Sequence, residues 1–143
     1  MNLNSYTLRK VTAAEAAVLL PGLADLLCAV VDDGASIGFL PPLDRAEALD
    51  YWQGVADALR TPYRIMLVAE ADGQLAGTVQ LDLAAKANAR HRAEVIKLMV
   101  GPAYRRRGIA QALMQAIEAE AGQARRTTLV LDTPVLDVNT EIG

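Results

Sequence analysis

The sequence has few of the residues from which metal and disulfide sites are built. Its 143 residues include one cysteine, one histidine and only 4% aromatic residues. A single cysteine excludes an internal disulfide, and one cysteine with one histidine cannot supply a closed zinc site. Cys28 lies in the apolar run "LADLLCAVV", which predicts a small buried side chain rather than a catalytic thiol. We therefore expect no metal centre.

Long apolar segments are missing as well. No apolar run approaches the roughly 20 residues that span a bilayer, and the beginning of the chain, "MNLNSYTLRK", contains no apolar signal segment. These absences predict a cytoplasmic protein without a membrane partner. Hydrophobic residues nevertheless make up 52% of the chain, and no repeat or linker-like stretch divides it. Residues 1–143 are therefore expected to form a single domain with a substantial core.

Positive charge is in the minority but is concentrated in one window. The formal net charge is -3, with 14 Lys and Arg against 17 Asp and Glu, so we expect no nucleic-acid partner. Between positions 86 and 107, however, Glu94 is the only acid among seven basic residues. This window either binds a small polyanion or is a solvated basic edge, and charge alone does not decide between the two. The seven are Lys86, Arg90, Arg92, Lys97, Arg105, Arg106 and Arg107.

Capping and turn signals predict the order of helices and strands. "YTLRKV" predicts a first strand, and Thr12 with Glu15 has the spacing of a capping box. The helix that follows is "AAEAAVLLPGLADLLCAVVDDG", which we expect Pro21 to bend or break. "RAEALDYWQGVADAL" predicts a second helix, and Asp-Gly between two apolar runs predicts a hairpin.

The second half of the chain predicts a strand-loop-helix crossover. "EVIKLMV" has the composition of a strand, "IAQALMQAIEAEAG" that of an amphipathic helix, and "TTLVLDT" that of a last strand. The predicted order is therefore β-α-α-β-β-β-α-β, an α/β domain with a largely antiparallel sheet.

The crossover contains the stretch "YRRRGIAQALM", residues 104–114. A strand that leads through a glycine-containing loop into a helix is typical of anion sites, because the first helical turn presents unpaired N–H groups and a partial positive charge. Gly108 would allow close approach of the backbone, and the arginines would add charge-assisted hydrogen bonds. The loop lacks the Gly-Lys-Ser/Thr of a P-loop and the G-x-G-x-x-G of dinucleotide-binding proteins.

This loop resembles the coenzyme A signature of the GNAT superfamily of N-acyltransferases, Arg/Gln-x-x-Gly-x-Gly/Ala, with Arg105, Gly108 and Ala110 at its defined positions. The stretches "GASIGFLPPL", "RAEVIKLMVGPAYRRRGIAQALM" and "LVLDT" look similar to tabtoxin-resistance acetyltransferases and their relatives, over residues 5–133. The resemblance implies a layered α+β fold of GNAT type, with a mixed, largely antiparallel sheet flanked by helices. It also implies transfer of acetyl from acetyl-CoA to a small amine by direct attack in a ternary complex, in a toxin- or antibiotic-modifying enzyme.

The resemblance implies two catalytic acids, Glu94 and Asp132, because an ammonium must lose a proton before it can attack a thioester. Glu94 could instead form an ion pair with Arg92 or Lys97, and Asp132 could cap a helix.

The remaining site residues divide between the amine side and the acetyl-CoA side. Ile37, Phe39 and Trp52 are expected on the amine side, although Phe39 and Trp52 could equally be core residues. The residues expected to bind acetyl-CoA, in part through backbone groups, are Leu98, Met99, Val100, Arg105, Arg106, Arg107, Gly108, Ile109, Ala110 and Gln111.

The resemblance stops after residue 133. "PVLDVNTEIG" does not match the C-terminal helix and strands of the family pattern, so we expect a truncated or frame-altered domain that lacks them and is impaired in turnover. The "TTLVLDT" strand would then have an unpaired edge, through which a homo-oligomer is expected unless the protein is poorly stable. Two rival hypotheses are a non-catalytic CoA-binding module of the same fold and a nucleic-acid accessory protein.

Overall fold

A computed structural model of the chain describes residues 5–34, 38–83 and 91–131. Within these residues it contains five strands, four α-helices and one short 3-10 turn. In chain order they are β1 (Thr7–Lys10), α1 (Ala13–Val18), α2 (Leu20–Asp32), α3 (Arg45–Ala58), β2 (Arg64–Ala71), β3 (Gln74–Asp82), β4 (Arg92–Val100), the 3-10 turn (Pro102–Tyr104), α4 (Ile109–Gln123) and β5 (Thr128–Leu131).

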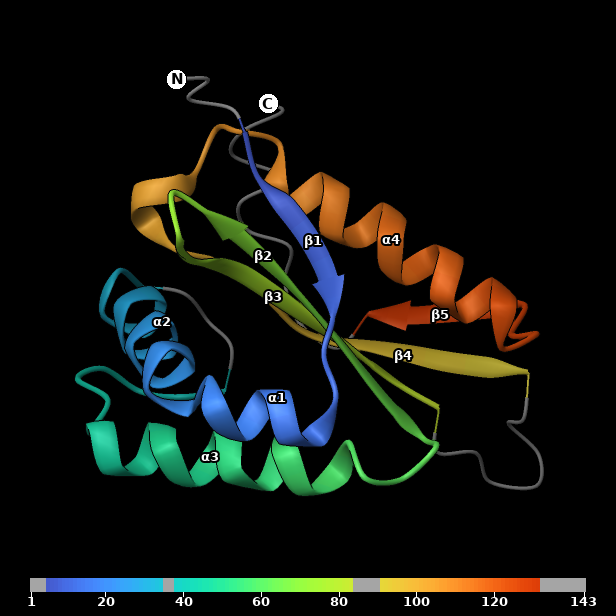
Figure 1. The fold of residues 1–143 in the computed structure, drawn as a ribbon, viewed down its shortest axis with the longest axis horizontal. Helices are drawn as coiled ribbons and strands as arrows, with labels where there is room; N and C mark the ends of the chain where they lie inside the picture. The colour runs from blue at the N-terminus through green and yellow to red at the C-terminus, as the bar shows by residue number, and fades with distance from the viewer. Residues whose placement is uncertain (1–4, 35–37, 84–90, 132–143) are drawn as a thin grey trace.

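The strands form one sheet in the order β1-β2-β3-β4-β5. The first three pairs are antiparallel and the β4–β5 pair is parallel. Helices α1–α3 cover one face of the sheet and α4 covers the other (Figure 1). The predicted mixed, largely antiparallel sheet flanked by helices is therefore confirmed. No helix among the described residues is both long and apolar enough to cross a membrane.

Alternation along the strands divides the core into two clusters. Along β2 the side chains alternate between the two faces. Met66 and Val68 pack with α2 and α3, and the residues that follow each of them, Leu67 and Ala69, pack with α4. This period of two places successive side chains on opposite faces, so both faces of the sheet are apolar and both are covered.

The first helical segment departs from the predicted order. Its capping box is confirmed: the Glu15 N–H donates to Thr12 Oγ1 at 3.1 Å and the Thr12 N–H donates to Glu15 Oε1 at 2.8 Å. The helix ends at Val18, however, and Pro21 lies in the first turn of a new one. Proline is favourable there because the first-turn N–H groups have no helical partner. Three helices therefore precede β2, where the predicted order had two.

The hairpin between β2 and β3 is the predicted Asp72-Gly73 turn. Both residues are left-handed, with φ of 55° and 76°, and Ala71 pairs with Gln74 across the turn. These angles match a type I′ turn, whose twist suits the flanking strands.

Strand β4 carries a bulge that the sequence did not reveal. Ile96 pairs with Gln80 and Met99 pairs with Thr78, so β4 has one more residue than β3 in this interval. Lys97 lies in the bulge with φ 54°, a left-handed conformation that is uncommon for lysine. On its other side β4 pairs with β5 only over residues 92–95. Among the described residues, β4 therefore has a strand neighbour on both sides only in its first half.

β5 is the last strand of the described sheet, and its Val130 and Leu131 are 39% and 51% exposed. Self-association along this edge stays a prediction.

The close approach of β3 to the bulge generates a stability prediction. A Cβ on buried Gly77 would lie 2.8 Å from the carbonyl oxygen of Met99, so Gly77→Ala should displace β4 and cost about 1–3 kcal/mol. Gly54→Ala, at an exposed helical position with no atom within 4 Å, should instead stabilise by about 0.5–1 kcal/mol. Urea unfolding measures both. A Gly77→Ala protein as stable as the parent would contradict this prediction, because β4 could then move aside without loss of free energy of unfolding.

Candidate functional site

The loop between β4 and α4 ends at an open helix N-terminus. Gly108 is the N-cap of α4 with φ 79°, it is exposed, and a Cβ placed on it would meet no described atom within 4 Å. No described side chain caps the helix. The first-turn N–H groups therefore follow an exposed residue without a side chain and have no described side-chain cap, although Ile109 and Ala110 are themselves buried. An uncapped helix N-terminus favours anions.

Arg105 and Arg107 of the loop each contact a carboxylate of the chain itself. Arg105 Nη1 donates to Asp33 Oδ2 at the C-terminal end of α2. Arg107 Nη1 lies 3.4 Å from Asp72 Oδ2 in the hairpin turn, and its guanidinium lies 5.4 Å from the centre of the Tyr104 ring. These pairs tie the loop to α2 and to the hairpin. Arg105 and Arg107 therefore hold the loop in place as well as adding positive charge to it.

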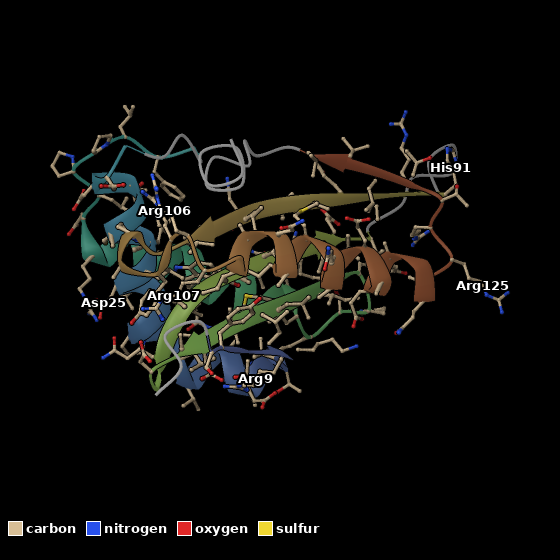
Figure 2. The ribbon with its side chains drawn as sticks, turned by 90° about the horizontal axis from the view of Figure 1, so that it is seen from above. Arg9, Asp25, His91, Arg106, Arg107 and Arg125 are labelled. Atoms are coloured by element: carbon tan, nitrogen blue, oxygen red, sulfur yellow. The ribbon has the colours of Figure 1, made fainter. Side chains whose placement is uncertain are left out.

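The basic window does not form one continuous patch in the described part of the chain. Figure 2 places Arg106 and Arg107 at one end of the molecule and His91, which precedes β4, at the other. The nine residues of β4, at about 3.3 Å per residue, separate Arg92 from the arginine loop. Lys86 and Arg90 of the window lie outside the described residues.

The predicted CoA-binding residues of β4 have buried side chains. Leu98 and Val100 pack toward α4, and Met99 packs toward α2 and α3. Their side chains therefore belong to the core, and any contact with a ligand would use their backbone groups.

Glu94 lies on the α1–α3 face of the sheet, half-buried, in a row of charged residues. It pairs with Asp82 of β3 and, on its other side, with Val130 of β5. Asp82 in turn pairs with Arg64 of β2, whose Nη2 lies 3.6 Å from Asp82 Oδ2. Asp82 and Arg64 were not predicted as site residues, because only the strand register brings them to Glu94. Asp132, the second predicted acid, lies outside the described residues.

Phe39 and Trp52, two of the predicted amine-side residues, pack in the same core cluster and both contact the Tyr51 ring. Trp52 is fully buried, which favours the alternative of a core residue. Phe39 is half-buried, with its ring 5.5 Å from that of Tyr51 and 5.8 Å from Lys97 Nζ. It therefore lies beside the β4 bulge. Ile37 is outside the described residues.

The structure gives Cys28 no sign of activation. Burial, with nearby carboxylates, raises the pKa of its thiol above the ordinary value, and its Sγ contacts the Leu43 carbonyl at 3.6 Å. Reactive cysteines have a lowered pKa, so Cys28 is a packing residue, although it is half-buried where the sequence predicted a buried side chain. The described residues contain no group of three His, Cys, Asp or Glu side chains that could hold a metal ion.

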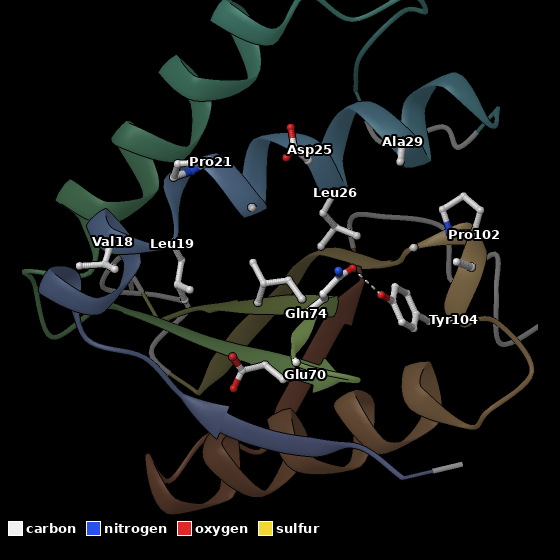
Figure 3. A pocket seen from close by; sticks show the side chains of 15 residues that line it. Val18, Leu19, Pro21, Asp25, Leu26, Ala29, Glu70, Gln74, Pro102 and Tyr104 are labelled. Atoms are coloured by element: carbon white, nitrogen blue, oxygen red, sulfur yellow. Dashed lines mark hydrogen bonds between the residues drawn. The ribbon is translucent and has the colours of Figure 1, made fainter. Parts of the chain in front are cut away.

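A groove of about 540 Å³ lies between α2, the β2–β3 hairpin and the 3-10 turn (Figure 3). Leu26, Leu75 and Pro102 supply apolar walls, and Tyr104 donates to Gln74 Oε1 at 3.0 Å at its edge. None of the described site residues predicted from sequence lines it.

Comparison with known sequences identifies relatives over most of the chain. The model of the Acetyltransferase (GNAT) family matches residues 26–139. The chain is also 36% identical over 112 residues to an uncharacterised N-acetyltransferase of Azospirillum brasilense, from the hisH-hisA intergenic region. That match covers 74% of this chain and 65% of the relative, so the chain spans less than two thirds of that protein.

Solved structures share the fold at lower sequence identity. Membership of the family is shown by the match to the family model. An aminoglycoside acetyltransferase from an uncultured soil metagenomic sample aligns with a TM-score of 0.67 at 20% identity, over 95% of this chain and 86% of that one. A predicted acetyltransferase of Clostridium acetobutylicum, solved with acetyl-CoA, aligns with a TM-score of 0.66 at 17% identity, over 97% and 89%. With the fold shared and the family pattern matched from residue 26 to 139, the chain belongs to the GNAT family of acetyltransferases.

Proposed function

We propose that this protein is an N-acetyltransferase that moves acetyl from acetyl-CoA to a small amine. The observation that carries the proposal is the open N-terminus of α4 behind Gly108, at the end of a strand whose second half has no described neighbour on the β5 side. The structure of a GNAT-fold acetyltransferase with acetyl-CoA supports the choice of co-substrate. A small amine acceptor is supported by the likeness to an aminoglycoside acetyltransferase, which is also the basis for proposing a toxin- or antibiotic-modifying role.

The residues present fit the pyrophosphate of CoA. The N–H groups of residues 109–111 begin α4 and have no described side-chain cap, so an anion there would satisfy donors that have no partner within the helix. Because Arg105 and Arg107 already contact carboxylates, the backbone and the helix dipole carry much of the recognition. We propose that Arg106, exposed and left-handed with φ 66°, lies next to the same anion.

The chemistry requires an amine that has lost its proton. Acetyl-CoA supplies a thioester whose carbonyl carbon bonds to the amine nitrogen, while the bond to sulfur breaks and the thiolate leaves. We assign proton acceptance from the ammonium, directly or through water, to the half-buried Glu94 carboxylate. Backbone N–H groups near the bulge at Lys97 would polarise the thioester carbonyl. Phe39, close to that bulge, would contact the acceptor.

The loop assignment predicts a selective loss of CoA binding in Gly108→Val. A branched side chain there would obstruct approach to the helix N-terminus, and losing one charge-assisted hydrogen bond of about 1.5–3 kcal/mol lowers affinity roughly tenfold or more. Gly73→Val is the matched control, because Gly73 has φ 76° and also has open space around it. Each variant should lose about 1–2 kcal/mol of stability from left-handed strain. Calorimetry that shows unchanged CoA affinity in Gly108→Val would exclude this site.

The assignment of Glu94 predicts a changed pH–rate profile in Glu94→Gln. Glutamine keeps the shape but cannot accept a proton, so acetyl transfer should fall on the order of 100-fold, most strongly below the pKa of the acceptor amine. CoA affinity should not change. Glu118→Gln, on the exposed face of α4, removes the same charge elsewhere and should behave as the parent does. Identical pH–rate profiles for Glu94→Gln and the parent would remove Glu94 from the mechanism. CoA binding by the parent without any acetyl transfer would instead favour a non-catalytic CoA-binding module.

A further inference from the structure

Three charged side chains from adjacent strands lie in one row on the α1–α3 face of the sheet. Arg64 of β2 pairs with Asp82 of β3, and Asp82 pairs with Glu94 of β4. Directly opposite residues of antiparallel strands point to the same face, with Cβ atoms about 4.5–5.5 Å apart. Asp82 therefore lies on the strand between Arg64 and Glu94, and Asp82 and Glu94 are cross-strand neighbours.

A buried amide fixes the arginine at the far end of this row. Arg64 Nη1 donates to Gln80 Oε1 at 2.8 Å, and Gln80 Nε2 donates to the Tyr51 hydroxyl at 3.0 Å. Gln80 is fully buried, and a buried polar network stabilises only when its members are satisfied. An apolar residue at position 80 would fill the same space without needing hydrogen-bond partners. The network thus holds the Arg64 guanidinium against β3, with its Nη2 3.6 Å from Asp82 Oδ2.

We propose that Asp82 is a positioning residue for acetyl transfer, whose negative charge raises the proton affinity of Glu94. Like charges disfavour ionisation of a neighbouring carboxylate, so Asp82, which lies directly opposite Glu94 in the sheet, offsets the opposite effect of the Arg64 guanidinium. A base with raised proton affinity is better matched to an amine near neutral pH. The inference rests on the proposed function of Glu94 as proton acceptor.

Other charged groups near Glu94 are common to every variant compared below. Arg92 and Lys97 are cations of β4 itself, and Lys97 Nζ lies 5.8 Å from the centre of the Phe39 ring. Tyr51 is the titratable side chain that α3 adds to the network. Described β5 residues 128–131, which are Thr, Leu, Val and Leu, carry no charge. A difference between variants at position 82 therefore reports on Asp82.

The test is the titration of Glu94 in Asp82→Asn, followed by NMR of the chain with ¹³C-labelled glutamate carboxyl groups and assigned by Glu94→Gln. Asparagine keeps the shape of aspartate without its charge, and the Glu94 midpoint should fall by about one pH unit. The acidic limb of the pH profile of kcat/KM should shift in the same direction as the Glu94 midpoint. Arg64→Gln, which removes the counter-charge, should move the midpoint upward. Glu118→Gln on α4 controls for net charge and should leave it unchanged.

Equal Glu94 midpoints in the parent and in folded Asp82→Asn would overturn the proposal, as would an equal shift in Glu118→Gln. If Asp82→Asn does not fold, Asp82→Ser, which also removes the charge, takes its place, and an unshifted Glu94 midpoint in that variant would count against the proposal. The NMR readout needs no catalysis. A parent that transfers no acetyl would therefore refute the proposed function, while the Glu94 titration would still decide the role of Asp82.

Discussion

The pairing of β3 with β4 is the constraint on which the rest of the site depends. β3 holds β4 from the Asp82–Glu94 pair to the Gly77–Val100 pair, whereas β5 holds it only over residues 92–95. The additional residue at Lys97 bends β4 without breaking this pairing, and Gly77 has no side chain to oppose the close approach of Met99. One edge of β4 is therefore fixed along its length, which positions both Glu94 and the loop into α4.

The arginine loop shows why local charge is a poor guide to what an anion would contact. Arg105 and Arg107 are neutralised by carboxylates 72 and 35 residues away in the chain, so they hold the loop against α2 and the hairpin. Exposed ion pairs of this kind contribute little free energy, but two of them with the Tyr104–Gln74 hydrogen bond restrict how the loop can move. In the proposed function, recognition of a phosphate then falls mainly to backbone N–H groups, which Gly108 leaves uncovered.

Local sequence signals predicted most of the elements because their causes are local. The Thr12–Glu15 capping box and the Asp72-Gly73 turn act within a few residues, and both have the expected geometry. Pro21 was recognised as a disruption, but the sequence did not show that it would begin a separate helix. The choice between a bend and a break depends on how α1 and α2 pack against α3, and that packing is not local.

By itself, the sequence determined the fold class, the family resemblance and the loop that ends at Gly108, because apolar periodicity and glycine geometry act along the chain. The tertiary structure decided which residues meet. Strand register places Asp82 and Arg64 beside Glu94, and burial places Trp52 in the core. No spacing in the chain encodes these contacts, since a register is set by the whole sheet and a shift of one residue would turn every side chain to the other face.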